Sequence, residues 1–146
     1  MPLKLLKKKN YLTMIENATK GPNYMFRNLY ADIDGKEVDI LNNGRWSCDV
    51  VVSSILYLHK LVKDVRANVE STERDMRGSG WYEIKDLRPG AVLMWEKKLG
   101  DDDGKMHSHN GFYVGGDMAV SNDSKGTGFP WKHHYTYNGT RKIEKI

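Results

Sequence analysis

Residues 48–62 read CDVVVSSILYLHKLV, and the secondary structure of this segment decides the class of the fold. The run of valines is typical of a strand, whereas the length of the segment favours a helix. Ser47 can serve as the N-cap of such a helix, and Asp49 suits its positive first turn. Lys60 and Lys63 suit its negative end. We therefore predict a helix whose apolar face is formed by Val51, Val52, Ile55, Leu58 and Val62.

The chain before this helix contains turn signals that divide it into short elements. Residues 3–18 carry leucine and isoleucine among lysines, which predicts a short helix that Gly21-Pro22 ends. Residues 26–41 surround Asp34-Gly35, a dipeptide typical of the tight turn of a β-hairpin. Asn42-Asn43-Gly44 predicts a further turn immediately before the central helix.

The chain after this helix changes to strand-like patterns. Ser71-Thr72-Glu73 predicts the start of a second, short helix that ends at Gly78. Turn residues then separate strand-like segments at Ala91–Glu96, Gly111–Val114, Met118–Ser121, His134–Tyr137 and Lys142–Ile146. Helices followed by consecutive short strands indicate an α+β fold with an antiparallel sheet. We expect a single domain over residues 1–146, with an N-terminal helix and hairpin extension at 1–41 and a core at 42–146.

The composition excludes several classes of protein. Hydrophobic residues make up 39% of the 146 residues, and the 15 aromatic ones, Trp 4, Tyr 8 and Phe 3, supply anchors that a disordered chain lacks. No apolar run approaches the roughly 18 residues of a membrane span. A single cysteine excludes an internal disulfide. The net charge of +4 favours contact with anionic polymers without identifying one.

Cys48, the only cysteine, stands at the predicted start of a helix. A free cysteine is commonly a small buried hydrophobic residue. A helix N-terminus, however, lowers the pKa of a thiol and offers backbone N–H groups to an oxyanion. A nucleophilic cysteine also needs a base, and we expect His109 at the start of a strand, with His107 in the preceding loop. His59 lies about three helical turns after Cys48, too far away to reach back.

A third polar side chain should hold the imidazole of His109. The hairpin expected to turn at Gly115-Gly116 brings Ser121 and Asn122 back level with this histidine. Alternation along a regular strand lets only one of the two face it. An amide oxygen is a firm acceptor whereas a hydroxyl can rotate away, and so we favour Asn122.

Three motifs in order resemble one group of enzymes. They are Trp46-Ser47-Cys48 at the predicted helix start, LRPGAVLMW at residues 87–95 and HNGFYVGGDMAVSN at residues 109–122. Together they resemble the NlpC-type and CHAP-type cell-wall hydrolases over about residues 42 to 122. The resemblance implies a papain-like fold in which the helices pack on the antiparallel sheet.

The resemblance also implies an activity. The protein would be a cysteine hydrolase, an amidase or peptidase similar to an endolysin, that cleaves peptide or amide bonds of bacterial peptidoglycan without a cofactor. Cys48 would be the nucleophile and His109 the base. Ungapped alignment of the motif puts Ser121 at the third catalytic position, with Asn122 one residue later. Trp46 and Trp131 are candidate substrate-binding residues, although aromatic side chains are more commonly part of a core.

The expected partner is peptidoglycan or another peptide substrate, bound by a monomer. Lys7-Lys8-Lys9 favours a solvated helix face over a nucleic-acid-binding arm. The N-terminal MPLKLLKKKNYL is basic but lacks the apolar segment of a signal peptide. We therefore expect a protein made in the cytoplasm that acts at the cell wall after lysis or separate delivery.

Two other functions remain open at this stage. One is a non-catalytic module that binds an anionic wall polymer through its positive charge. The other is a metal-dependent hydrolase that uses His107 and His109, because His-x-His occurs in zinc enzymes. No second metal-ligand motif accompanies this pair, and Asp101-Asp102-Asp103 is typical of a solvated acidic loop. We therefore expect no metal site.

Overall fold

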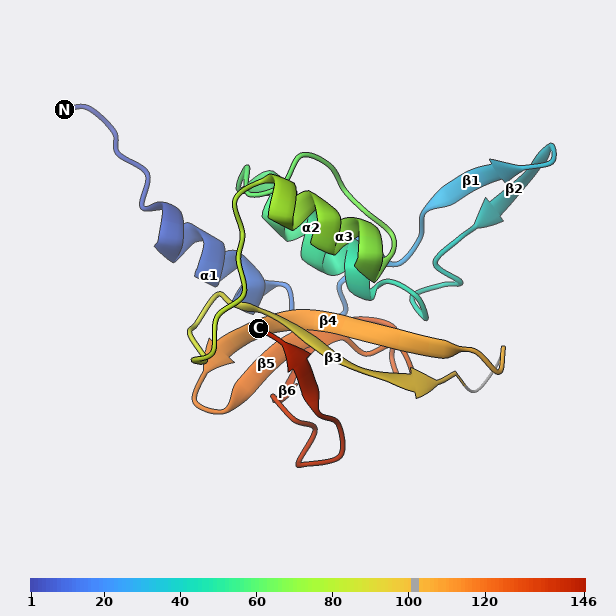
Figure 1. Ribbon diagram of the computed structural model, residues 1–146. Helices are drawn as coiled ribbons and strands as arrows, with labels where there is room; N and C mark the ends of the chain where they lie inside the picture. The colour runs from blue at the N-terminus through green and yellow to red at the C-terminus, as the bar shows by residue number, and fades with distance from the viewer. Residues whose placement is uncertain (101–102) are drawn as a thin grey trace.

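The computed structural model describes residues 1–100 and 103–146, which form three α-helices and two antiparallel sheets (Figure 1). The α+β class is therefore as predicted. The helices are α1 (Lys7–Asn17), α2 (Cys48–Leu58) and α3 (Val69–Gly78). Among the described residues, none of the helices combines the length and the hydrophobicity needed to cross a membrane.

The larger sheet contains five strands in the order β6-β5-β4-β3-β7, all paired antiparallel. Its strands are β3 (Val92–Leu99), β4 (Met106–Gly115), β5 (Met118–Asn122), β6 (Pro130–His134) and β7 (Ile143–Lys145). The α2 helix packs across β4 and β5. The central strand, β4, is therefore covered by the helix that begins at Cys48.

The central segment is a helix, as predicted, although it is shorter than residues 48–62. It ends at Leu58, whose side chain is exposed, and the chain then turns at Lys60 with a positive φ of 57°. Ser47 occupies the N-cap position, but its hydroxyl makes no capping hydrogen bond. Leu56 takes the buried position expected of Leu58. The lysines after residue 58 lie beyond the helix end and do not belong to its last turn.

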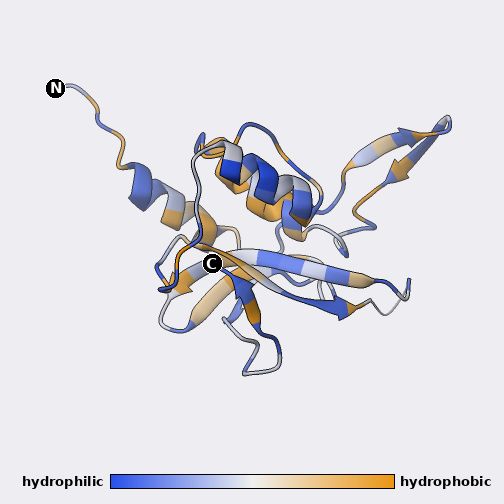
Figure 2. Ribbon diagram, in the orientation of Figure 1, coloured by the Kyte–Doolittle hydropathy of each residue, from blue (hydrophilic) through white to orange (hydrophobic). Residues whose placement is uncertain are grey.

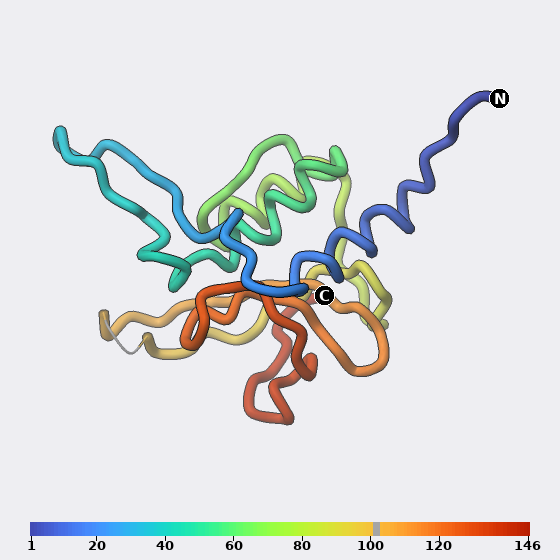
Figure 3. The backbone as a smooth tube through the Cα atoms, turned by 180° about the vertical axis from the view of Figure 1, so that it is seen from behind, coloured from blue at the N-terminus to red at the C-terminus, as the bar shows by residue number. Residues whose placement is uncertain are grey.

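The N-terminal helix and the hairpin both form, but α1 begins at Lys7, after the predicted start, and Leu3 and Leu6 are exposed. Strands β1 (Tyr30–Ile33) and β2 (Lys36–Asp39) pair around Asp34 and Gly35, both of which have positive φ. Such dihedrals match the right-handed twist of the two strands, which is why Asp-Gly marks a hairpin. The hairpin projects from the body of the molecule on the side opposite the N-terminal segment (Figures 1 and 3).

Other expected boundaries were also wrong. The α3 helix begins at Val69 because Asn68, and not the Ser71-Thr72 pair, caps it: its Oδ1 accepts from the Ser71 N–H at 2.8 Å. The β4 strand begins at Met106, so His107 lies in the strand and not in a preceding loop. The β6 strand ends at His134, where the sequence predicted a strand to begin.

Both faces of the larger sheet are buried at its three middle strands, because alternate residues of β3, β4 and β5 contribute to two separate clusters. One cluster lies between the helices and the sheet, where hydrophobic residues gather on α2 while α3 is mostly hydrophilic (Figure 2). It includes Val51, Val52, Ile55, Leu56, Val92, Phe112 and Val120. The opposite face is covered by the C-terminal segment and includes Leu93, Trp95, Tyr113, Ala119, Tyr135 and Tyr137.

Candidate active site

A cleft of about 1240 Å³ runs past the N-terminus of α2 and along β4. All five site residues expected from the sequence line it: Trp46, Cys48, His109, Asn122 and Trp131. Residues about sixty positions apart in the chain are thus brought to one cavity by the packing of α2 on the sheet.

Cys48 is partly exposed in this cleft, and its thiol donates to the Asp49 carboxylate at 3.4 Å. Burial and the charge of Asp49 raise the pKa of the thiol well above its ordinary value, outweighing the backbone N–H groups of Asn110 and Asp49. The lower thiol pKa expected of a helix N-terminus is therefore not what the structure shows. The loss of water and the local carboxylate have a larger effect on this pKa than the two backbone N–H groups.

Asp49 is itself held in place. Its Oδ1 accepts from Asn110 Nδ2 at 2.7 Å and from Thr72 Oγ1 at 3.2 Å, and its side chain is buried. Burial raises the pKa of this carboxyl to about 6. Asp49 thus connects α2 to α3 and to β4, and at neutral pH it places a negative charge beside the nucleophile candidate.

These contacts predict the alkylation behaviour of Cys48. In the wild type, the rate of labelling by iodoacetamide should keep rising with pH beyond 9, because the thiolate is the reactive form. Asp49→Asn should speed labelling at pH 7.5 by about tenfold for each pKa unit by which the thiol falls. The measurement is the labelling rate across pH, read by mass spectrometry.

Glu70→Gln is the matched control, since it removes a carboxylate that lines the same cleft, whereas the carboxylate that raises the Cys48 pKa is that of Asp49. An unchanged rate in Asp49→Asn would contradict the assignment of the raised thiol pKa to this carboxylate. If iodoacetamide labelled the wild type only as fast as the protein unfolds, Cys48 would be a structural residue that the reagent cannot reach in the folded state.

His109 is held rigidly on β4. Its ring stacks on Trp95, with centroids 5.2 Å apart, and its Nε2 lies 3.1 Å from Ser121 Oγ. Its other ring nitrogen, Nδ1, makes no hydrogen bond within residues 1–100 and 103–146. Burial, and then the charges of Arg141 and His133, lower the pKa of His109 to about 3. The imidazole is therefore neutral at pH 7, and in this environment it is a weaker base than an exposed histidine.

Ser121, and not Asn122, contacts His109. Gly111 pairs with Ser121 across β4 and β5, so the Ser121 side chain shares a face with His109. Asn122 points the other way, and its Nδ2 donates to Gly44 O at 2.6 Å and to Ser124 Oγ at 3.0 Å. The contact expected of Asn122 is thus made by Ser121, because β5 remains regular through this position. Asn122 instead ties the sheet to the turn before α2.

The two tryptophans lie on the rim of the cleft with partly exposed rings. Trp46 is 38% exposed and meets the His107 ring edge-on at 4.9 Å, and Trp131 is 39% exposed and lies 5.1 Å from the His133 ring. Exposed aromatic faces at a cleft can bind apolar or sugar surfaces of a ligand. His107 also lines the cleft, and its Nε2 is 2.8 Å from an Asp103 carboxylate oxygen.

Three further side chains belong to this site, and the sequence pointed only to His133, as a residue that either lines a groove or caps the sheet. His133 and Tyr137 stack with ring centroids 4.1 Å apart, and both contact Ser121. The guanidinium of Arg141 donates to Glu96 O at 2.9 Å and to His107 O at 3.3 Å, and it faces the cleft. Alternation of Trp131 and His133 along β6 could have placed His133 on a shared face, but it required the strand boundaries that were misjudged.

The described part of the chain contains no cluster of three or more His, Cys, Asp or Glu side chains that could hold a metal ion. His107 and His109 have different partners, Asp103 and Ser121 respectively. Asp101 and Asp102 of the expected acidic loop lie outside the described residues.

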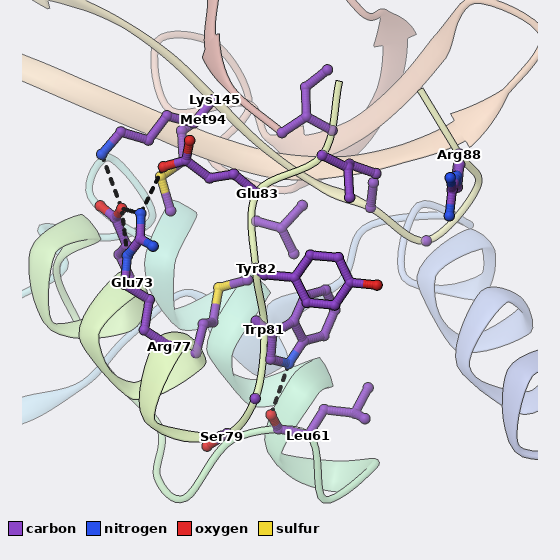
Figure 4. Close-up of a pocket in the computed structure, with 17 residues that line it drawn as sticks. Leu61, Glu73, Arg77, Ser79, Trp81, Tyr82, Glu83, Arg88, Met94 and Lys145 are labelled. Carbon is purple, nitrogen blue, oxygen red and sulfur yellow. Dashed lines mark hydrogen bonds and ion pairs between the residues drawn. The ribbon is translucent and has the colours of Figure 1, made fainter. Parts of the chain in front are cut away.

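A second cavity, of about 430 Å³, lies between α3, the chain that follows it and the C-terminal residues (Figure 4). At the edge of this cavity, the Glu73 carboxylate forms ion pairs with Arg77 and Lys145. Trp81 Nε1, which also lines the cavity, donates a hydrogen bond to Leu61 O. Neither cysteine nor histidine is among the described residues that line it. The first cleft is therefore the candidate reaction site.

Comparison of the chain with models of protein families and with curated protein sequences finds no match.

Proposed function

We propose that this protein is a papain-like cysteine hydrolase that cleaves peptide or amide bonds of bacterial peptidoglycan. One observation carries the proposal: Cys48 at the start of α2 and His109 on β4 line the same cleft, and the Ser121 hydroxyl lies 3.1 Å from Nε2 of the imidazole. A nucleophile, a base and a group that orients the base are the parts that acyl transfer requires. The peptidoglycan substrate rests on the resemblance of the three motifs.

The pKa shifts determine how the reaction would start. The thiol of Cys48 has a raised pKa and the imidazole of His109 a lowered one, so both are neutral in the free protein at pH 7. His109 Nδ1 would accept the thiol proton as Sγ attacks the carbonyl carbon, and would then donate it to the leaving amine. Water would hydrolyse the thioester, with His109 again as base. Backbone N–H groups at the start of α2 would stabilise the oxyanion.

The test is digestion of purified peptidoglycan sacculi of more than one chemotype, with mass analysis of the released fragments. The wild type should release fragments with new amino and carboxyl termini, and Cys48→Ser should release none. Iodoacetamide should abolish the activity, and a chelator should leave it intact. Activity that is sensitive to the chelator and retained by Cys48→Ser would favour the metal hydrolase. Binding of sacculi without release by the wild type would favour the binding module.

Ser121 and Asn122 should differ in what their loss affects. Ser121→Ala removes the contact to His109 Nε2 and should lower turnover on the order of a hundredfold, with little change in KM, because a misplaced base reacts poorly. Asn122→Ala leaves that contact in place but removes the bond to Gly44 O, so its main effect should be on stability.

Steady-state kinetics together with urea denaturation separate these two effects. If Asn122→Ala reduced turnover more than Ser121→Ala at equal stability, the orienting role would belong to Asn122.

A further inference from the structure

The hydroxyl of Ser121 lies at the centre of a buried group of polar rings. Its Oγ is 3.1 Å from His109 Nε2, 2.7 Å from His133 Nε2 and 3.1 Å from the Tyr137 hydroxyl. Ser121 is fully buried, so it is not itself available to attack a substrate. The donor of each of these three hydrogen bonds can be assigned, because a hydroxyl has a single hydrogen and so donates only one of them.

The backbone fixes the first bond of this group. His133 Nδ1 lies 2.7 Å from the carbonyl oxygen of His134, and a carbonyl only accepts, so Nδ1 carries the hydrogen. The ring of His133 is buried against Tyr137, and burial lowers its pKa, which keeps it neutral at pH 7. A neutral imidazole protonated at Nδ1 has an acceptor at Nε2. The hydroxyl of Ser121 therefore donates to His133.

The remaining two contacts of Ser121 must then be donated to its oxygen. The oxygen can accept two hydrogen bonds, which His109 Nε2–H and the Tyr137 hydroxyl supply. His109 must consequently carry its hydrogen on Nε2. Its Nδ1 is left as a lone pair on the side where it has no protein partner within residues 1–100 and 103–146.

We infer that His133 is a positioning residue: acting through the Ser121 hydroxyl, it selects the tautomer of His109 in which Nδ1 is the free base. The chain of bonds runs from the His134 carbonyl through His133 and Ser121 to His109. Register explains how these side chains meet, since Ser121 pairs with Trp131 and His133 follows two residues later on the same face of β6. The catalytic consequence rests on the proposed function, whereas the tautomer does not.

The first test is long-range proton–nitrogen NMR on the ¹⁵N-labelled protein without substrate. The five histidines can be assigned by single His→Gln variants. We expect His109 to be protonated at Nε2 and His133 at Nδ1 in the wild type near pH 7. A His109 ring protonated at Nδ1 would overturn the inference, whether or not the protein hydrolyses peptidoglycan.

Variants of His133 provide the second test. His133→Phe keeps an aromatic ring against Tyr137 but removes the acceptor, so the hydroxyl of Ser121 is free to turn and His109 should show a mixture of tautomers. The kcat of His133→Phe should fall on the order of a hundredfold with KM nearly unchanged, because the wrong tautomer of His109 cannot take the thiol proton. His133→Gln can accept through its amide oxygen and should restore most of both signals.

His134→Gln is the matched control, because its side chain contacts Thr136 and Asn138 and not Ser121. It should leave the tautomer of His109 unchanged. If His133→Phe does not fold, the wild-type spectrum and His133→Gln still decide the matter. An Nε2-protonated His109 that persists fully in a folded His133→Phe would show that Ser121 needs no partner to select the tautomer, and would overturn the inference.

Discussion

His109→Ala should reduce turnover of peptidoglycan on the order of a thousandfold, as expected when a general base is removed. The imidazole of His109 is neutral, its Nε2 is bonded to Ser121, and it lines the same cleft as Cys48. The raised pKa of the thiol leaves almost no thiolate at pH 7, so without His109 no side chain is in place to take up the thiol proton during the attack. The measurement is the rate of fragment release, with folding checked by circular dichroism.

His107→Ala is the control for this prediction. His107 is on the same strand and lines the same cleft, but its ring is bonded to Asp103 and packs against Trp46. Its loss should therefore cost much less than the loss of His109. Equal losses, or a larger loss in His107→Ala, would reassign the base to His107.

Trp95→Ala should lower the free energy of unfolding by about 4 kcal/mol, as is typical when a buried aromatic side chain is truncated. The indole of Trp95 is fully buried, and its Nε1 donates to Tyr135 O at 2.7 Å. It also stacks on His109 and fills the space beside Gly111, where an added Cβ would lie 3.0 Å from the indole. The variant would leave a cavity, an unpaired carbonyl and an unsupported His109.

Urea denaturation measures this loss, and Trp131→Ala provides the comparison. Trp131 is 39% exposed, so its truncation removes less buried surface and should cost less than Trp95→Ala, about 2 kcal/mol. Similar losses in the two variants would mean that Trp95 is not the anchor of the sheet face that carries His109.

Several features of this fold could be predicted from local sequence because their causes are local. Asp34-Gly35 adopts positive φ angles that suit a hairpin, whatever surrounds it. The apolar residues of 48–58 recur at helical spacing, which predicts a helix with one buried face, and that face packs on the sheet. Cys48 and His109 could be chosen from the types of residue that nucleophilic catalysis needs. Errors fell on boundaries, as at Ser71 and His134, where caps and strand partners outside the segment decide the ends.

The sequence by itself therefore determined the elements, their order and the two side chains best suited to acyl transfer. Only the tertiary structure decided that Ser121 contacts His109, because cross-strand register sets which face a side chain occupies. The tertiary structure also brought His133 to Ser121, and it placed the buried Asp49 carboxylate beside the Cys48 thiol. Burial and the distance between charges determine pKa values and tautomers, and both depend on residues far apart in the chain.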